Sequence, residues 1–393
     1  MPGRPAGQVE NDPVAGFKIL IDHAASGCCH ELDTREDGNG LNGTFVNGGI
    51  EMKRPVAAIT MVFNEAIFLP IWLNHYGSAL GYENLFVIDD GSNDVSIRND
   101  RIVNLVSRKR GLLDERERAK TISYFHEELL QYYDVVLYAD ADELIVPEPN
   151  LEISLKDYLI AGKGELINTI GLNVLHHRAR EGPLDLAKPL FSQRAYVQFD
   201  ELYCKPVIAR APMRWTPGFH FCARAPCYAT DLYLFHLRAM DYDISRAKVK
   251  NLNAVSFSED SLRHGYGFYF RMPEQEYLNL FFATPEAEFA KARSELDFSA
   301  ELPRINKRPG IGPIARVPSR FRNAIELTTA EAAARETVAA TSDLDAGRLY
   351  STAIARMTAQ EAPASRNAMC PCGSGKRFKH CHGLLAQVLP TSG

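Results

Sequence analysis

Long apolar runs and a strong excess of one charge are both missing from this sequence. No segment approaches the roughly 18–20 uninterrupted apolar residues of a membrane-spanning helix. Near the amino terminus, Phe17–Asp22 carries charges where a signal peptide has its apolar core. The net charge of −5 argues against nucleic acid as the main partner, although local basic patches stay open. These absences favour a cytoplasmic protein and leave open a peripheral position at the inner face of the membrane.

Cysteine is sparse over most of the chain, and we detect no internal repeat. Of the eight cysteines, three crowd into one short segment at the carboxyl end. In a reducing compartment such clusters indicate metal binding more than disulfides. Cys28-Cys29-His30 has no partners at a recognisable spacing, so loop or packing residues are favoured over a metal site there. With 393 residues, the chain is long enough for one large domain and an appendage.

Residues 55 to about 147 alternate between strand and helix patterns. Val56–Phe63 is a near-continuous apolar run, as expected for a parallel strand buried on both faces. An amphipathic helix is expected over Ile67–Ala79, ended by Gly81. The further expected elements are a strand at Asn84–Asp89, a helix-like piece at Ser96–Arg108, a long helix at Asp114–Tyr133 and a strand from Val135. This order predicts an open α/β sheet, which binds ligands outside the carboxyl ends of its parallel strands.

Downstream, shorter strands predict a mixed or antiparallel extension of the sheet. They are expected at Ile167–His176, Ala195–Phe199, Lys205–Ala211 and Asp231–Leu237, followed by helices at Asp243–Val255 and Pro273–Phe282. From Phe289 to Ala364 the chain is charged and alanine-rich, with helical patches at Thr328–Ala340 and Ala346–Ala359. We therefore divide the chain into an N-terminal extension (1–54), an α/β domain (55–288), a helical linker or arm (289–365) and a small terminal segment (366–384).

Three carboxylates, Asp140, Asp142 and Glu143, follow the apolar run that begins at Val135. If the chain stays extended, Asp140 and Asp142 share a face, because residues two apart point the same way. Adjacent carboxylates repel unless a cation neutralises them or one keeps its proton. Oxygen ligands suit Mg²⁺ or Mn²⁺, and Mg²⁺ typically takes one or two carboxylates plus substrate phosphates. The alternative is a pair of solvated acids at the end of a strand.

Polar residues follow all three predicted parallel strands, at the point where each one ends. Asn64-Glu65 closes the first strand, Asp89-Asp90 the second, and the acids from Asp140 the third. The carboxyl ends of parallel strands are where such sheets bind ligands, so this placement favours a functional site over solvated acids.

Four fragments in this order resemble a glycosyltransferase of the family-2 type, within it a branch of bacterial proteins with an Asn-Glu start. The fragments are Met61–Ala66, Leu69–Tyr76, Val87–Asp94 and Tyr138–Glu143. The resemblance covers residues 55 to about 250. It implies the A-type glycosyltransferase fold, a single nucleotide-diphosphate-sugar-binding sheet between helices. It also implies transfer of a sugar from a nucleotide-diphosphate donor to an unidentified glycan, lipid or protein acceptor.

The resemblance also assigns roles to residues. Asn64, Glu65 and either Asp89 or Asp90 would hold the base and ribose of the donor. Asp140 and Asp142, beside Glu143, would bind the Mg²⁺ or Mn²⁺ that bridges the diphosphate, because the leaving nucleotide needs a Lewis acid. Two side chains on the preceding helix could add positive charge near the phosphates, although a solvated helix face is favoured for them: Arg118 and Lys120.

Members of this fold often take a third metal ligand from a later part of the chain. His236 ends an apolar strand pattern and fits that role better than His220, while His176-His177 is more typical of a strand end. The alternative for each is a packed, hydrogen-bonded histidine. An inverting transferase also needs a carboxylate base. A family-like Glu-Asp pair is absent, the stereochemical outcome stays open, and no spacing decides among five candidates: Asp200, Glu201, Asp231, Asp241 and Asp243.

The carboxyl end carries the most specific pattern in the chain. Three thiolates and an imidazole form a Cys₃His set, which matches a closed tetrahedral structural Zn²⁺ site. His380 is a competing ligand, and a disulfide is the alternative to a metal site. So short a segment needs the metal to fold. It resembles the SEC-C motif, the zinc-binding tail known from the bacterial translocation ATPase. Its basic face indicates an interaction surface, for a protein or a ribosome-like partner, more than a catalytic role. The expected zinc ligands are Cys370, Cys372, Cys381 and His382.

Two other functions remain as alternatives. A sugar nucleotidyltransferase on a similar sheet usually begins with a Gly-rich, basic loop after the first strand, and Phe63–Ala66 is not one. A non-catalytic adaptor would use a decayed transferase domain to support the zinc tail, but the intact Asp140 and Asp142 argue against decay.

Overall fold

The structure is a computed structural model that describes residues 43–46, 49–305, 310–327 and 342–360, with Asn367 and Arg377. The expected zinc ligands, the Cys28-Cys29-His30 cluster and the helical patch at Thr328–Ala340 lie outside the described residues. Within the described part, no helix is both long and apolar enough to cross a bilayer.

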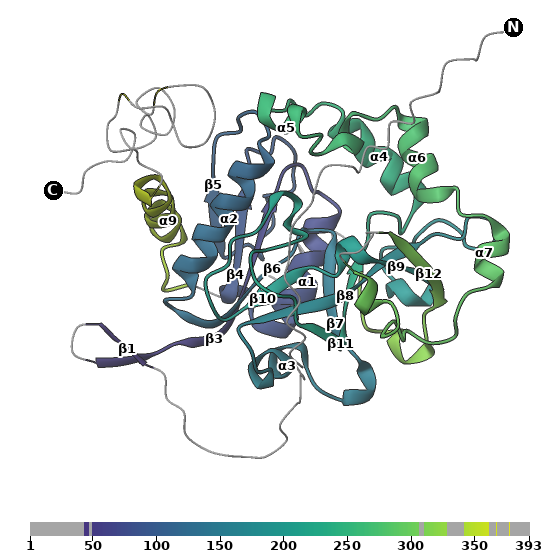
Figure 1. Ribbon diagram of the computed structural model, residues 1–393, viewed down its shortest axis with the longest axis horizontal. Coiled ribbons are helices and arrows are strands. Elements are labelled where there is room, and N and C mark those ends of the chain that lie inside the picture. The colour runs from purple at the N-terminus through teal and green to yellow at the C-terminus, as the bar shows by residue number, and fades with distance from the viewer. Residues whose placement is uncertain are drawn as a thin grey trace, which may run out of the picture.

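The described residues form one large mixed sheet of 10 strands and a separate two-stranded ribbon (Figure 1). Four neighbouring strands run parallel: β5 (Asn104–Ser107), β4 (Leu85–Asp89), β3 (Arg54–Val62) and β6 (Tyr133–Tyr138). The sheet continues from β6 through β10 (Pro206–Ala209), β8 (Leu166–Leu175), β9 (Tyr196–Asp200) and β12 (Ile311–Arg316). A further pair, β7 (Glu143–Pro147) and β11 (Tyr228–His236), joins through β8, and β1 (Gly43–Val46) with β2 (Gly49–Met52) forms the ribbon.

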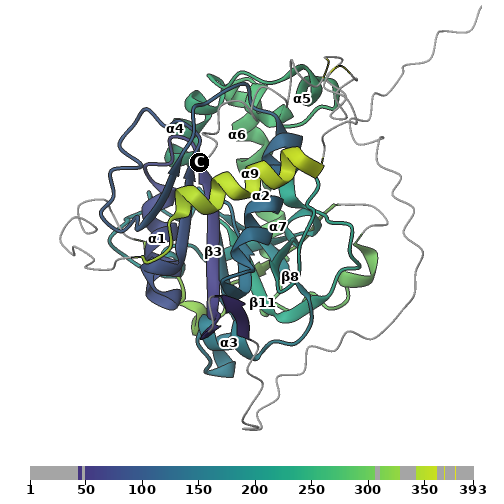
Figure 2. The ribbon, with the colours of Figure 1, turned by 90° about the vertical axis from the view of Figure 1, so that its left-hand side faces the viewer.

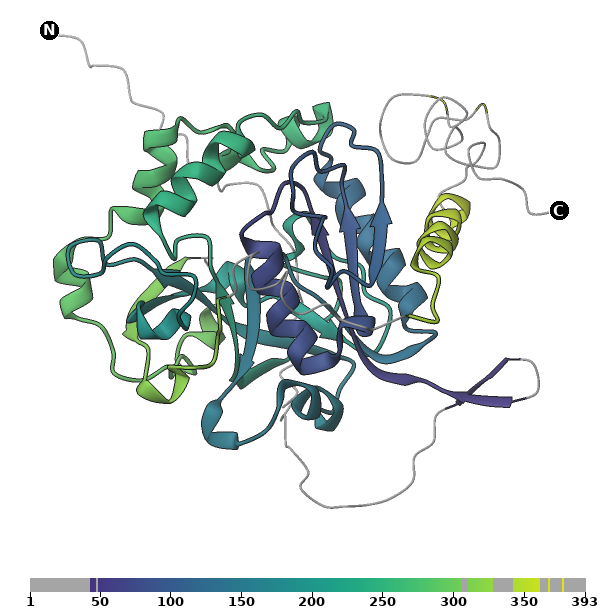
Figure 3. The same ribbon diagram turned by 180° about the vertical axis from the view of Figure 1, so that it is seen from behind.

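Helices cover both faces of the parallel strands because successive residues of β3 point to opposite sides. Val56, Ala58 and Val62 face the core under α1 (Phe68–Leu80) and α3 (Leu155–Ala161), which Figure 3 shows in front of the sheet. Ala57, Ile59 and Met61 face the core under α2 (Glu115–Leu129) and α9 (Ala346–Gln360). Figure 2 shows α9 lying across this second face. Both cores are apolar, as the near-continuous apolar run in β3 predicts.

A group of short helices lies over the carboxyl ends of the parallel strands. They are α4 (Tyr242–Leu252), α5 (Glu259–Arg263) and α6 (Glu274–Phe282), with α7 (Glu286–Ala290) beside β12 (Figure 1). Asp241 caps α4, because its side chain accepts hydrogen bonds from the backbone N–H groups of Asp243 and Ile244. Asp114 caps α2 in the same way. These caps fix the two helices that bring basic side chains to the site.

The structure confirms the predicted strands at the three polar clusters and the helices between them, except for Ser96–Arg108. That segment forms turns and then the edge strand β5, which pairs with β4. Asp94 and Asn99 accept hydrogen bonds from the backbone N–H groups two residues later. Such side-chain bonds compete with helix formation, so the helical prediction was wrong here.

The expectation of a helical arm over 289–365 is only partly met. Within it, β12 extends the sheet antiparallel to β9, and Ile314 and Ala315 are buried against the core. The predicted helix at Ala346–Ala359 corresponds to α9, which packs against α2 through the buried Leu349, Ala353 and Met357. Because the segment is charged and alanine-rich, its sequence pattern did not indicate the short strand β12.

The packing of α9 gives a testable prediction. Leu349 is fully buried, so Leu349→Ala should lower the free energy of unfolding by about 2–5 kcal/mol, through lost apolar burial and the cavity left behind. Leu112 is exposed, and Leu112→Ala should change it by less than about 0.5 kcal/mol. Guanidinium unfolding curves compare the two variants, and equal midpoints would contradict the observed packing of α9.

Candidate functional site

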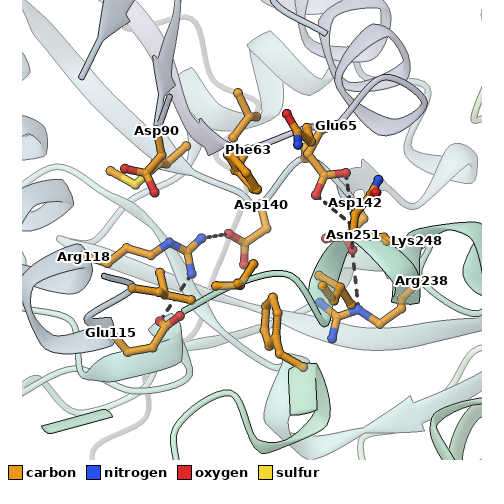
Figure 4. A pocket seen from close by; sticks show the side chains of 18 of the residues that line it. Phe63, Glu65, Asp90, Glu115, Arg118, Asp140, Asp142, Arg238, Lys248 and Asn251 are labelled. Atoms are coloured by element: carbon orange, nitrogen blue, oxygen red, sulfur yellow. Dashed lines mark hydrogen bonds and ion pairs between the residues drawn. The ribbon is translucent and has the colours of Figure 1, made fainter. Parts of the chain in front are cut away.

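A cavity of about 120 Å³ lies at the carboxyl ends of β3, β4 and β6. Residues from the ends of these strands, from α2 and from α4 line it, and Figure 4 shows their side chains. Asn64 adopts a left-handed backbone (φ 54°), which asparagine tolerates better than most residues. Its side chain exchanges hydrogen bonds with Asn93, of 2.9 Å each, and so ties the loop after β3 to the loop after β4. The predicted clusters therefore do meet at one edge.

The chain turns between Asp140 and Asp142 instead of staying extended. The Glu143 N–H donates a hydrogen bond to the Asp140 carbonyl oxygen (2.9 Å), which closes a tight turn. Asp140 and Asp142 therefore do not share a face, and their carboxylates point toward different walls of the cavity (Figure 4). Each carboxylate has its own set of basic neighbours.

Asp140 faces α2 and the start of β10. The Arg118 guanidinium lies 2.5 Å from Asp140 Oδ1, and the Tyr138 hydroxyl donates to the same oxygen at 2.6 Å. Lys205 Nζ lies 3.4 Å from Oδ2. Burial raises the pKa of Asp140, but Arg118 and Lys205 outweigh it and hold the pKa well below the ordinary value. Asp140 is thus a charged carboxylate at neutral pH.

Arg118 therefore belongs to the site, and the preference for a solvated helix face was wrong for it. Lys120 pairs with Glu117 one turn away (3.2 Å) and is not among the residues that line the cavity. Glu143 lies on the far side of Lys205, whose Nζ is 2.5 Å from Glu143 Oε1. Lys205 and Glu143 are both almost fully buried, so their contact is a buried ion pair.

Asp142 faces α4 and the end of β11. Lys248 Nζ lies 3.2 Å from Asp142 Oδ2, and the Arg238 Nε lies 3.6 Å from the same oxygen. Lys248 also contacts Glu65 at 3.0 Å, so it bridges the buried Asp142 carboxylate and the partly buried Glu65 carboxylate. Burial raises the pKa of Asp142, and Lys248 and Arg238 more than reverse this, so the pKa lies far below its usual range.

His236 stands beside Asp142 with a defined proton arrangement. The register of β11 with β8 places His236 opposite Asn173. The Asn173 amide nitrogen donates to Asp200 (2.8 Å), so its oxygen must accept from His236 Nδ1–H (2.7 Å). The Nε2 lone pair then faces Asp142 Oδ2 at 3.8 Å. Burial lowers the pKa of His236 well below its usual value, which keeps the ring neutral.

This pair fits a divalent cation. The part of the chain that the structure describes holds no group of three or more His, Cys, Asp or Glu side chains in metal-binding arrangement. Asp142 and His236 nevertheless present a carboxylate, which suits Mg²⁺ or Mn²⁺, and an unprotonated ring nitrogen, which suits transition metals and so favours Mn²⁺ over Mg²⁺. The Asn173 contact to the other ring nitrogen is the support that metal-binding histidines usually have. Asp140 points to the opposite wall.

Asp89 is the last residue of β4, and of Asp89 and Asp90 only Asp90 lines the cavity. The Asp89 carboxylate accepts from the Ser92 N–H (2.7 Å) and shapes the loop. Asp90 is held by Arg108 and Arg110, each at 2.8 Å. The Arg110 guanidinium also lies 3.4 Å from the centre of the Phe63 ring.

Sequence reasoning missed several residues of this site: Phe63, Arg110, Asn173, Lys205, Arg238 and Lys248. Lys248 lies 106 residues from Asp142, and no local spacing signals that pairing. The charged face of α4 was the available signal, but such a face is usually solvated.

A second, larger cavity of about 450 Å³ adjoins the first and shares Arg118, Asp140 and Arg238 with it. His220 lies in its wall, where Nδ1 contacts the Leu202 carbonyl oxygen (2.7 Å), away from the Asp142 pair. His176 and His177 line a separate cavity near α7.

Among the five candidate bases, all within the described residues, Asp200 alone lines either of the two adjoining cavities. Burial raises the pKa of Asp200, so this carboxylate takes up a proton more readily than an exposed aspartate does. Asp231 bonds to Tyr158 (2.6 Å), and Asp241 pairs with Arg194 (2.9 Å) beside Asp243 in the cap of α4. Glu201 follows Asp200 in a short 3₁₀ helix, outside the lining of both cavities.

Comparison with known proteins identifies the carboxyl-terminal segment. Residues 366–384 match a family model described as the SEC-C motif. The chain carries a SEC-C motif. Its residues include all four expected zinc ligands, which lie outside the described part of the structure.

Curated relatives are Protein translocase subunit SecA of several bacteria. The Verminephrobacter eiseniae protein is 28% identical over 140 residues, which are 35% of this chain and 14% of the relative. The Stenotrophomonas maltophilia protein is 34% identical over 119 residues, 26% of this chain and 13% of the relative. The Anaplasma marginale protein is 81% identical over 21 residues, 5% of this chain and 2% of the relative. The chain thus spans no more than 14% of the length of these relatives.

Solved structures show only a weak likeness. Glucosyl-3-phosphoglycerate synthase from Mycobacterium tuberculosis, in complex with Mg²⁺ and uridine diphosphate, is 20% identical with a TM-score of 0.23, over 30% of this chain and 44% of that one. Mannose-1-phosphate geranyltransferase from Thermus thermophilus is 11% identical with a TM-score of 0.24, over 59% of this chain and 69% of that one. Scores this low carry no argument about the fold or the function.

The bridging role of Lys248 gives a second prediction. Lys248→Met removes the partner that Glu65 and Asp142 share, so the free energy of unfolding should fall by about 3–5 kcal/mol because buried charges lose their compensation. Lys250 on the same helix is exposed, and Lys250→Met should change it by less than about 0.5 kcal/mol. Urea unfolding at pH 7 compares the variants. A Lys248→Met protein as stable as Lys250→Met would show that the network does not hold the site.

Proposed function

We propose that this chain is a metal-dependent glycosyltransferase of the family-2 type, with an A-type fold over residues 55–288, that moves a sugar from a nucleotide-diphosphate donor. The observation that carries the proposal is the Asp142–His236 pair at the carboxyl edge of the sheet, set in a wall of basic side chains. The four fragments that resemble this family fall on β3, α1, β4 and the β6–β7 turn, and all but the one on α1 contribute residues to the lining of this cavity.

The charge of the site supports a cation that arrives with the donor. Around the acidic turn, the described residues include five carboxylates and four basic side chains, so the side chains leave no surplus of positive charge. They are Glu65, Glu115, Asp140, Asp142 and Glu143 against Arg118, Lys205, Arg238 and Lys248. A diphosphate brings two further negative charges, which this set of side chains does not neutralise. A divalent cation supplies the missing charge.

In this proposal Asp142 and His236 hold the cation together with Asp140, which would have to turn from Arg118. When bound, Mg²⁺ or Mn²⁺ supplies Lewis-acid stabilisation of the leaving nucleotide diphosphate. Lys248 and Arg238 keep Asp142 ionised. Arg118 lies between the two cavities and can turn from Asp140 to a phosphate oxygen.

The smaller cavity would hold the donor, with Asn64, Glu65 and Asp90 near the nucleotide. Asp200, in the larger cavity, would take the proton from the acceptor hydroxyl. The SEC-C motif would bind Zn²⁺ through Cys370, Cys372, Cys381 and His382 and contact a protein partner.

Thermal unfolding with UDP, GDP and their sugars, each with and without Mn²⁺, tests the donor site. One nucleotide should raise the melting temperature only when Mn²⁺ is present, because the cation joins the diphosphate to the site. A ligand at about 100 times its Kd stabilises the native state by about 2.7 kcal/mol. Asp142→Ala and His236→Gln should abolish this shift while circular dichroism shows a native fold.

Asp243→Ala is the matched control, because Asp243 is an exposed carboxylate on α4 outside both cavities. It should keep the full shift. If no nucleotide stabilises the wild-type protein, the transferase proposal fails. The result would then favour the non-catalytic adaptor, in which the SEC-C motif is the functional part. A shift that does not depend on Mn²⁺ would remove the cation from the proposal.

A further inference from the structure

The mouth of the larger cavity is lined by large apolar side chains that face water. Leu202 is 37% exposed, Phe268 53%, Leu280 50% and Ile311 62%, and all four line this cavity. They come from four separate elements: the 3₁₀ helices Glu201–Tyr203 and Phe268–Arg271, α6 and β12. Single exposed apolar residues are common on proteins, but several at one opening indicate a ligand surface. We call these four residues the apolar rim.

The inner end of the same cavity is polar and buried. Asp200, Glu143 and Lys205 lie there, with the partly buried Asn173 hydrogen-bonded to Asp200. Asp200 is the candidate proton acceptor, so a hydroxyl group at this end would meet it. The cavity therefore combines buried polar groups with an exposed apolar rim.

The basic groups at the polar end are already paired. Lys205 contacts Glu143 at 2.5 Å, and Arg118 contacts Asp140 at 2.5 Å. Arg238 lies 3.6 Å from Asp142 and 4.7 Å from the centre of the Tyr269 ring. An anionic acceptor would have to break one of these pairs, whereas a neutral hydroxyl compound would not. Charge and exposure together thus favour a neutral ligand with an apolar part.

We propose that the larger cavity binds a neutral amphipathic acceptor, a hydroxyl compound with an alkyl body that lies on the apolar rim. This inference rests on the proposed transferase function. In the transfer, the acceptor oxygen forms a bond to the anomeric carbon of the donor sugar, and the bond from that carbon to the phosphate oxygen breaks. The acceptor proton passes to the Asp200 carboxylate, and the electron pair leaves with the nucleotide diphosphate.

Alkyl β-D-glucosides of increasing chain length, used below their micelle concentrations, are direct probes. Calorimetric titration of the full chain with methyl, butyl, hexyl and octyl glucoside measures binding without any donor. Affinity should rise about two- to fourfold per added methylene group from butyl to octyl, as expected for burial of apolar surface. Phe268→Ser and Leu280→Ser should each weaken octyl glucoside binding at least fivefold.

Leu262→Ser is the matched control. Leu262 is a 45% exposed leucine on α5 that does not line the cavity, so octyl glucoside binding should stay unchanged in this variant. Affinities that do not depend on chain length would overturn the inference, and so would equal losses in all three variants. Binding to phosphatidylcholine vesicles without binding of monomeric alkyl glucosides would also overturn it, in favour of a membrane-docking surface.

The same variants separate this inference from the proposed function. Phe268→Ser and Leu280→Ser should keep the nucleotide-dependent thermal shift, because neither residue lines the donor cavity. A nucleotide shift without a chain-length effect would overturn the amphipathic acceptor alone. The opposite result is also informative. If no nucleotide stabilises the protein but affinity rises with alkyl chain length and the rim variants remove that rise, the transferase function is overturned and the apolar binding site is kept.

Discussion

Pairing of buried charges at the turn after β6 is the interaction on which the site depends. Within four residues the chain brings together the buried Asp142 and Glu143 and the partly buried Asp140, and an uncompensated buried charge costs several kcal/mol. Their partners come from α2, from the start of β10, from the segment after β11 and from α4. Compensation of these acids therefore fixes the relative positions of four elements that lie far apart in the sequence. The two cavities are what remains between those elements.

The two cavities share one wall, and Asp140 and Arg118 belong to it. This arrangement suits a reaction between two ligands, one on either side of the acidic turn.

The segment that precedes the SEC-C motif also reaches this region. Tyr350 of α9 hydrogen-bonds to Arg108, which in turn holds Asp90 at the first cavity. The described end of the chain thus packs against the helix and loop that form one side of the site.

Periodicity was sufficient to predict three of the four parallel strands, because β3, β4 and β6 are apolar on both faces and end in polar clusters. It failed for β5 and β12, whose few apolar residues lie among turn-forming or charged ones. The meeting of the clusters at one edge was predictable from the sheet. The turn between Asp140 and Asp142 was not, because a residue pattern does not fix a backbone turn there. Lys248, Arg238 and Asn173 could not be found, since their roles come from contacts across more than 60 residues of chain.

Cleavage of the donor is the most direct test of the claim that this acidic turn supports glycosyl transfer. Phosphorus NMR can follow the purified full chain with a panel of UDP- and GDP-sugars, with Mn²⁺ removed by chelation before each spectrum. We expect one sugar nucleotide to yield its nucleoside diphosphate, faster when an acceptor alcohol is present, and we expect Asp142→Asn to stop this release. Intact donors throughout, from a folded protein that binds both Mn²⁺ and nucleotide, would contradict the claim.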